Sequence, residues 1–216
     1  MKVLVVGANG QIGRHVCQLL HEKDNVSVRA MVRREEQAEA FKSQGIEAVV
    51  ADLEGPVSSL VSAMQSCDAI VFTAGSGGHT GADKTLLVDL DGAVKTIEAA
   101  EQAGVRRYIM VSAHQAHQRE NWNPKIKHYY VAKHYADRML TLSDLDYTII
   151  RPGGLLNTPA SGKVSLAENL ERGSISREDV ALTIVALLNA ENTYRQSYDL
   201  IEGETSIDEA VSSVNN

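Results

Sequence analysis

The chain has 216 residues, of which 44% are hydrophobic and 23% are charged, values close to those of an average globular domain. This length and composition predict a single domain with enough apolar material for a packed core. The formal net charge of −7 argues against a nucleic-acid partner and against an anionic membrane surface, and no apolar run approaches the roughly 18 residues that a membrane span needs.

The first apolar run ends at Gly7 and lacks the h-region and cleavage site of a signal peptide. Cys17 and Cys67 are the only cysteines, and each falls in a segment predicted to be helical. Two lone thiols are typical of small buried side chains in a reducing compartment rather than of a disulfide. We therefore expect a cytoplasmic protein.

Short β-branched runs alternate with amphipathic helical patterns along the chain. Strands are predicted at 2–7, 26–32, 46–51, 69–74, 106–113, 147–152 and 197–201. Helices are predicted at 12–23, 35–43, 56–66, 83–103, 124–142, 177–190 and 206–214. This alternation predicts a doubly wound α/β fold, in which a parallel sheet is covered by helices on both faces.

Local signals mark several helix starts and the loops between the elements. Pro56 suits the first turn of a helix, Asn123 is a candidate N-cap before Pro124, and a capping box begins at Ser176. The least patterned stretches are 74–82, 113–124 and 153–174, and each follows a predicted strand. Because ligands bind at the carboxyl ends of parallel strands, these three loops are candidate walls of a binding site.

A glycine-rich turn joins the first strand to the first helix. In the sequence GANGQIG, Gly7 permits a tight turn, Gly10 lets the backbone approach a pyrophosphate, and Gly13 allows close packing of helix and strand. The helix N-terminus offers free N–H groups to phosphates. The turn therefore predicts a dinucleotide site that also includes Asn9, Gln11 and Ile12, and a tight turn without a ligand is the alternative.

The spacing Gly-x-x-Gly-x-x-Gly resembles that of the extended and atypical branches of the short-chain dehydrogenase/reductase superfamily. Further motifs follow in the order that this family shows: Asp52-Leu53, the TAG sequence at 73–75, Asp89-x-x-Gly92, Tyr129-x-x-x-Lys133 and Arg151-Pro152-Gly153. The chain is most similar in pattern to small bacterial sugar-epimerase-like or NmrA-like oxidoreductases.

This resemblance implies one NAD(P)-binding domain of the Rossmann type over residues 1–216, with the substrate-side elements mainly in 153–216. It also implies further cofactor contacts. Asp52 and Leu53 would border the adenine ring, although Asp52 could instead be a loop acid that caps the next turn. Room for the cofactor would be left by Ala74 and Gly75, and its nicotinamide end would lie near Pro152 and Gly153.

The residue after the second strand bears on which nicotinamide cofactor is bound. NAD enzymes usually carry an acid about 20 residues past the glycine loop, whereas this sequence has Arg33 at that distance from Gly13. A guanidinium can hold a 2′-phosphate through two hydrogen bonds, and Arg14 could add a second cation. Either arginine could instead be solvated. We expect NADP(H) to be preferred over NAD(H).

The stretch HYYVAKH at 128–134 places Lys133 four residues after Tyr129. On a helix this spacing brings a phenol and an ammonium together, and the positive charge would lower the pKa of the phenol toward neutrality. The resemblance makes Tyr129 the general acid/base and Lys133 also an anchor for the nicotinamide ribose. Tyr130 should face elsewhere and pack. A surface lysine beside a core tyrosine is the alternative.

The residue that holds the substrate carbonyl is less certain from the sequence. The family places a serine or threonine at the end of the fifth strand, where this chain has Ser112 followed by Ala113. Ser112 is therefore the candidate. Alternatively, Ser112 is a plain strand-end serine, and either His114 is the donor or the carbonyl is not held in the usual way. Other candidates for the substrate pocket are His79 and Trp122. We expect no metal, because His114-x-x-His117 lacks supporting cysteines or acids.

These features predict an NADP-dependent oxidoreductase that acts on a small carbonyl or alcohol compound. One alternative is an NADP(H)-sensing regulatory protein of the NmrA type without turnover, and another is a sugar-nucleotide epimerase or dehydratase. The expected partner is a small-molecule substrate, with the chain as a monomer or a homodimer. No motif identifies the substrate.

Overall fold

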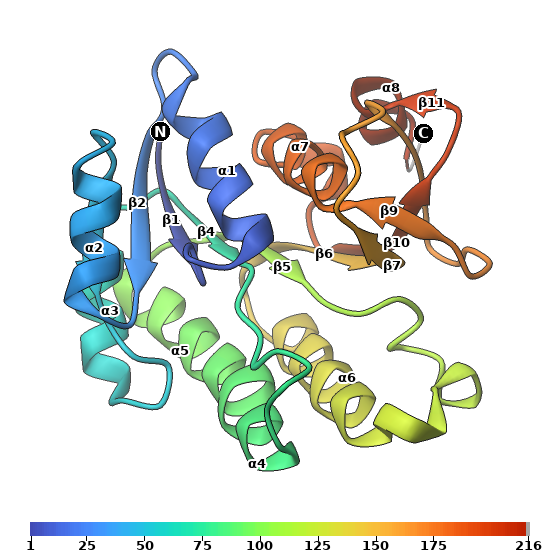
Figure 1. Ribbon diagram of the computed structural model, residues 1–216, viewed down its shortest axis with the longest axis horizontal. Helices are drawn as coiled ribbons and strands as arrows, with labels where there is room; N and C mark the ends of the chain where they lie inside the picture. Colours follow the sequence, from blue (N-terminus) through green and yellow to red (C-terminus); the bar gives the residue numbers. More distant parts are fainter. Residues whose placement is uncertain (215–216) are drawn as a thin grey trace.

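The computed structural model describes residues 1–214, and most of its strands form one sheet (Figure 1). Within this part of the chain the sheet has nine strands in the order β11-β8-β10-β6-β5-β4-β1-β2-β3. Their bounds are β1 (Lys2–Val6), β2 (Ser27–Val32), β3 (Glu47–Val50), β4 (Ala69–Phe72), β5 (Arg107–Val111), β6 (Asp146–Pro152), β8 (Lys163–Ala167), β10 (Gln196–Glu202) and β11 (Thr205–Ser206). The run from β3 to β10 is parallel, and its order 3-2-1-4-5-6 is that of a dinucleotide-binding fold. The predicted fold class is therefore confirmed.

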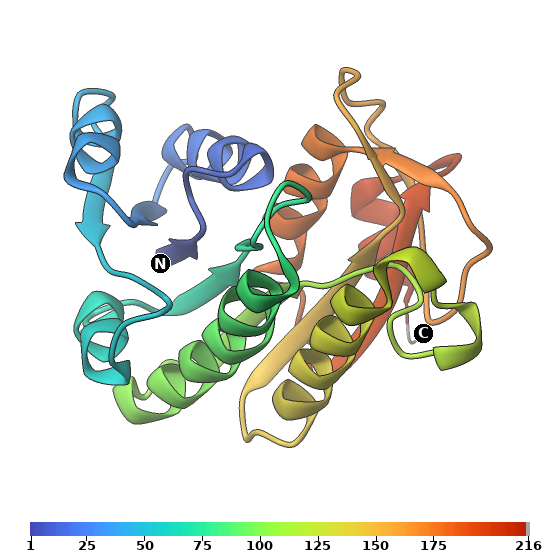
Figure 2. The ribbon, with the colours of Figure 1, turned by 60° about the horizontal axis from the view of Figure 1, so that its bottom comes forward.

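Helices cover both faces of the sheet. The first strand shows why, because Val3 and Val5 pack into one buried cluster whereas Leu4 and Val6 pack into the other. The first cluster includes side chains of α1 (Gln11–His21), α2 (Glu35–Lys42), α7 (Arg177–Leu187) and α8 (Ile207–Ser213), and the second includes side chains of α3 (Val57–Met64), α5 (Ala93–Ala103) and α6 (Lys127–Thr141). Figure 2 shows α5 and α6 side by side on their face of the sheet.

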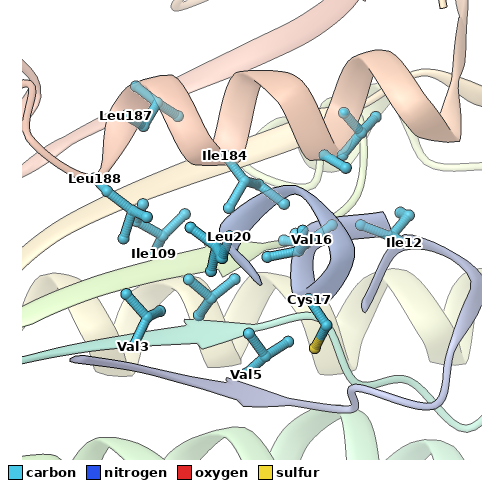
Figure 3. Close-up of a cluster of buried hydrophobic side chains, with 14 of the residues drawn as sticks. Val3, Val5, Ile12, Val16, Cys17, Leu20, Ile109, Ile184, Leu187 and Leu188 are labelled. Carbon is cyan, nitrogen blue, oxygen red and sulfur yellow. The ribbon is translucent and has the colours of Figure 1, made fainter. Parts of the chain in front are cut away.

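The packing of α1 against α7 joins the nucleotide-binding half to the C-terminal part. In Figure 3, Val16 and Leu20 of α1 lie beneath Ile184 and Leu187 of α7, and all four side chains are fully buried. Burial of an aliphatic side chain of this size contributes roughly 1.5 to 3 kcal/mol. The contact therefore fixes the start of α7 beside the glycine turn that precedes α1.

The long helix expected at 83–103 is present but is not uniform. It begins as α4 (Ala82–Lys84), continues as a π-helix over Thr85–Gly92, and ends as α5. A π-helix inside an α-helix often marks a functional site. Here its wider turns carry two buried polar side chains, Thr85 and Asp89.

Residues 153–174, one of the least patterned stretches of the sequence, contain strands that the sequence analysis did not predict. These are β7 (Gly154–Leu156) and β8, and β9 (Ser174–Ser176) begins at the end of the stretch. β7 and β9 form a small parallel sheet, whereas β8 pairs antiparallel with β10, so the main sheet is not entirely parallel. The short strand β7 escapes sequence patterns because all three of its residues are exposed.

Of the three predicted helix starts, the one at Ser176 is confirmed and the other two differ in detail. Ser176 accepts a hydrogen bond from the Asp179 N–H at 2.9 Å. Asn123 caps a 3₁₀ turn, η3 (Pro124–Ile126), by accepting from the Lys125 N–H, and α6 begins only after this turn. Pro56 is the residue before α3 rather than its first residue. Two further 3₁₀ turns are η2 (Arg119–Asn121) and η4 (Glu191–Thr193).

Both cysteines are buried, as expected, but Cys67 lies between α3 and β4 rather than in a helix. Burial raises the pKa of Cys17 to about 12 and also raises the pKa of Cys67. Across residues 1–214, no helix combines the length and the apolar character that crossing a membrane requires.

Candidate active site and cofactor cleft

The glycine turn has no space for a side chain at Gly7 or Gly13. Gly7 has a φ of 80°, and a Cβ there would lie 2.7 Å from Ala74 Cα. A Cβ at Gly13 would collide with the Gly7 carbonyl, which accepts a hydrogen bond from the Gly10 N–H at 2.9 Å. The turn leads directly into α1, whose N-cap Gly10 has no capping side chain. This backbone cradle and the open helix start fit the pyrophosphate of a dinucleotide.

A cavity of about 360 Å³ adjoins this turn. Arg33 lines it at one side. Its wall also includes these predicted cofactor residues: Gly7, Asn9, Gly10, Asp52, Leu53, Ala74 and Gly75. The structure thus brings residues from four separate strand ends to one cavity. His79, expected on the substrate side, lines this smaller cavity instead.

The remaining predicted cofactor residues lie around this cavity or beneath it. Gln11, Ile12, Pro152 and Gly153 line a second, larger cavity, and Gly13 packs against the turn without lining either one. Arg14 points to a separate hollow and donates to Asn9 Oδ1 at 2.7 Å and to the Asn9 carbonyl at 3.1 Å. Arg14 therefore reaches the smaller cavity only through Asn9.

Asp52 caps the next turn, as the alternative for it predicted, and also lies on the cavity wall. Its Oδ1 accepts a hydrogen bond from the Glu54 N–H at 3.0 Å, so it caps the turn that follows β3, and it also lines the smaller cavity. Next to it, Lys84 forms an ion pair with Glu54 at 2.7 Å. Lys84 also lines the smaller cavity.

The larger cavity has a volume of about 820 Å³ and holds all three predicted catalytic residues. Tyr129 and Lys133 come from α6, and Ser112 comes from the end of β5. Thr73, Ala74, Gly75, Ser76, Gly77 and Thr80 line both cavities, so the two adjoin along the chain that leaves β4.

Lys133 does not act on Tyr129 in the way that the spacing predicted. Its side chain is buried, and its Nζ donates to the Val111 carbonyl of β5 at 2.9 Å. Burial lowers the pKa of Lys133, and the carboxylates of Asp89 and Asp137 oppose this change. Burial raises the pKa of Tyr129 well above its usual value, and the negative charge of Asp89 adds to that rise. The expected lowering of the phenol pKa was therefore wrong, because desolvation is the largest effect on Tyr129 and the charges of Asp89 and Asp137 raise its pKa further.

Asp89 is a site residue that the sequence analysis did not select. Its side chain is 1% exposed, its Oδ2 accepts from the Ser76 N–H at 3.0 Å, and it lines the larger cavity from the π-helix. The signal in the sequence is the motif Asp89-x-x-Gly92, which belongs to the family pattern but does not by itself assign Asp89 to the site.

Ser112 is 5% exposed, and its Oγ has no hydrogen-bond partner among residues 1–214. A buried hydroxyl without a partner is costly unless a ligand supplies one. Its backbone is fixed, because the Ser112 N–H donates to the Ile150 carbonyl at 2.8 Å. Ser112 is therefore placed to hydrogen-bond an oxygen atom in the cavity.

The aromatic and histidine candidates divide between the cavity wall and the layer behind it. His114 lines the larger cavity, and its Nε2 lies 3.8 Å from Asp199 Oδ2. Trp122 does not line the cavity, because it is buried behind Tyr130, with which it stacks at 6.0 Å between ring centroids. Tyr130 itself lines the cavity, so the expectation that it faces elsewhere was wrong. The cavity is wide enough to reach two neighbouring faces of α6.

His114 also has a shifted pKa. Burial lowers its pKa, and the negative charge of Asp199 opposes this effect.

Within the described residues 1–214, no group of three or more potential metal ligands is close enough to hold an ion.

Comparison with known proteins places this cleft in a family. Residues 7–191 match the model of a family described as NAD(P)H-binding. A Bacillus subtilis protein named as the uncharacterized sugar epimerase YhfK is 59% identical over 98% of this chain and 99% of its own length.

Solved structures show the same similarity over the whole chain. A Bacillus halodurans structure, which carries the provisional name of an NAD-dependent epimerase/dehydratase, is 42% identical, covers 99% of this chain and 100% of its own, and has a TM-score of 0.92. The anaerobillin reductase ChuY of Escherichia coli O157:H7 is 29% identical over 95% of this chain and 99% of its own, with a TM-score of 0.79. The chain therefore belongs to the NAD(P)H-binding family, and its fold confirms the predicted resemblance to atypical short-chain dehydrogenase/reductases and NmrA-like oxidoreductases.

Proposed function

We propose that the protein is an NADP(H)-dependent oxidoreductase that transfers hydride to or from a small carbonyl or alcohol compound. One observation carries this proposal: Tyr129, Lys133 and Ser112 line a single cavity that adjoins the glycine turn. A proton donor, a cation and an unpartnered hydroxyl are the groups that carbonyl reduction requires beside a nicotinamide.

Each of these residues has a distinct part in the proposed reaction. The cofactor, when bound, supplies or accepts the hydride. Tyr129 donates a proton to the carbonyl oxygen, which Ser112 Oγ holds through a hydrogen bond. Lys133, whose Nζ donates to the Val111 carbonyl at 2.9 Å, would bind the nicotinamide ribose when the cofactor is present. Because burial raises the pKa of Tyr129, the phenol stays protonated at neutral pH, which suits the reduction direction.

The preference for NADP(H) rests on Arg33. This side chain lines the smaller cavity and forms no ion pair within residues 1–214. The acidic residue of that wall is Asp52, whose carboxylate caps the next turn. A guanidinium without an acidic partner favours a 2′-phosphate over a free ribose hydroxyl.

The experiment follows NADPH absorbance with quinones, aldehydes, sugar ketones and anaerobillin as substrates. Tyr129→Phe keeps the ring but removes the proton donor, so we expect kcat to fall about 100-fold or more. Tyr130→Phe, one residue away on the same cavity wall, is the matched control and should keep most of the activity. Wild-type reduction should change little between pH 6 and 9, because the raised pKa keeps the Tyr129 phenol protonated.

Equal turnover by wild type and Tyr129→Phe would refute the proposed proton donor. Sugar-nucleotide epimerisation remains a second candidate, because the relative from Bacillus subtilis is named as a sugar epimerase; epimerised product without net NADPH consumption would favour it. Cofactor binding without any turnover would favour the NADP(H)-sensing alternative. A cytoplasmic location and a monomeric or homodimeric state remain predictions from the sequence.

A further inference from the structure

The wall of the larger cavity is more basic than the protein as a whole. The chain carries a formal net charge of −7, yet the acidic residue of this wall is Asp89 alone among the described residues. Its carboxylate is already held by the Ser76 N–H. The basic side chains of the same wall are His114, His128, Lys133, Arg172 and Arg177.

Arg172 lies just before β9, on the loop that faces the end of β5. Its Nη2 donates to the Asn121 carbonyl at 2.9 Å, and it makes no ion pair within residues 1–214. Its positive charge contributes to lowering the pKa of His114 on the cavity wall. A neutral carbonyl therefore holds the guanidinium in place, and its positive charge is felt by His114 on the cavity wall.

Arg177 follows β9 as the first residue of α7. Its Nη1 donates to Asn157 Oδ1 at 2.8 Å, again a neutral acceptor. The neighbouring acids form no ion pair with it: Glu178 accepts from the Ala160 N–H, and Asp179 accepts from the Ser161 and Gly162 N–H groups. A cation at the start of a helix opposes the helix dipole. The fold thus retains an unpaired arginine where stability alone would favour an acid.

The same wall offers a flat aromatic surface. Tyr130 is stacked on the buried Trp122, with an angle of 16° between the rings. Tyr129 meets Tyr130 edge to face at 6.0 Å between ring centroids. A planar substrate could pack against this surface close to the Tyr129 hydroxyl.

From these contacts we infer that the cavity takes a planar carbonyl compound bearing a carboxylate or phosphate group, which Arg172 and Arg177 bind. This inference rests on the proposed function, for which it names the substrate class. Guanidinium groups bind both oxyanions through paired hydrogen bonds, so the two anions share one chemistry.

The test measures binding to the NADP⁺-loaded protein, in which no hydride can be transferred to an aldehyde. The ligands are 4-carboxybenzaldehyde, 4-formylphenyl phosphate and the neutral methyl 4-formylbenzoate, titrated by calorimetry. We expect at least one anion to bind about 10-fold more tightly than the ester, and the stronger of the two identifies the preferred oxyanion. Arg172→Gln and Arg177→Gln should each weaken the anion about 5-fold and leave the ester unchanged.

Arg138→Gln is the matched control, because this exposed arginine of α6 carries the same charge but does not line the cavity. It should leave all three affinities unchanged. Equal wild-type affinity for anions and ester would overturn the inference, as would equal losses for both in the arginine variants. Arg177→Gln that weakens NADP⁺ but not the aldehydes would remove Arg177 from the substrate site. Because binding is read without turnover, failure of the proposed reaction stays separate from failure of this inference.

Discussion

Burial shifts the pKa values of Tyr129 and Lys133 more than the charges of the neighbouring residues do. The spacing of Tyr129 and Lys133 predicts their contact with one cavity, but the pKa values of both groups follow from desolvation. Lys133 turns to a β5 carbonyl, and Tyr129 stays a phenol. Ser112 is a candidate hydrogen-bond donor to the substrate because its buried Oγ has no partner among the described residues, which only the folded structure shows.

Arg33 is expected to bind the 2′-phosphate of NADPH. Arg33→Ala should weaken NADPH binding about 10-fold, because a 2′-phosphate loses its guanidinium partner, and should leave NADH binding unchanged. Arg34→Ala is the control, since Arg34 follows directly but pairs with Glu36 and does not line the cavity. Fluorescence titration of both cofactors provides the measurement. Tighter binding of NADH by the wild type, unchanged in Arg33→Ala, would contradict the proposed NADP(H) preference.

At the scale of elements, buried polar contacts hold α7 on the sheet. Arg107 of β5 is 6% exposed and donates to the Leu187 and Leu188 carbonyls at the end of α7. It also donates to the Asp146 carbonyl at 2.7 Å and to Thr148 Oγ1 at 2.9 Å. Burial lowers the pKa of Arg107 to about 10, so it remains charged at neutral pH and suits the negative end of the helix dipole.

Arg107→Met should therefore destabilise the protein. The substitution leaves three buried carbonyls without their donor, which we expect to cost about 3 kcal/mol in the free energy of unfolding. The adjacent Arg106 is largely exposed and pairs with Asp146 at the surface, so Arg106→Met should barely shift the urea midpoint. Urea unfolding of both variants checks this, and equal midpoints would show that Arg107 is not the anchor of α7.

For the molecule as a whole, the junction after β6 joins the N-terminal strands and helices to the C-terminal part of the chain. Gly153 donates its N–H to the Leu200 carbonyl at 2.9 Å, which ties the junction to β10. A Cβ at Gly153 would collide with the Gly173 carbonyl and lie 2.9 Å from Ile201 Cγ2. The close approach of three segments therefore requires a glycine here, and the same segment lines the larger cavity.

Gly153→Ala should lower the free energy of unfolding by about 1 to 3 kcal/mol, because the added methyl group overpacks this junction. Gly154→Ala is the matched control, since a Cβ there meets the movable Ser174 Oγ at 3.2 Å. It should change stability by less than about 1 kcal/mol. Chemical denaturation distinguishes the two variants, and equal effects would mean that packing at Gly153 does not control the junction.

The sequence by itself determined the layered fold, the glycine turn and the meeting of Tyr129, Lys133 and Ser112. These follow from hydrophobic periodicity, from glycines that no other residue could replace, and from the rule that parallel strands end at one edge of a sheet. Tertiary structure alone decided the rest. Strand β7 is too short and exposed to show a pattern. Tyr130 and Asp89 reach the cavity through the packing of α6 against the π-helix. Arg172 and Arg177 become candidates for anion binding only in the folded protein, where they form no ion pair within residues 1–214. The sequence does not show this, because the residues that could pair with an arginine can lie far from it in the chain.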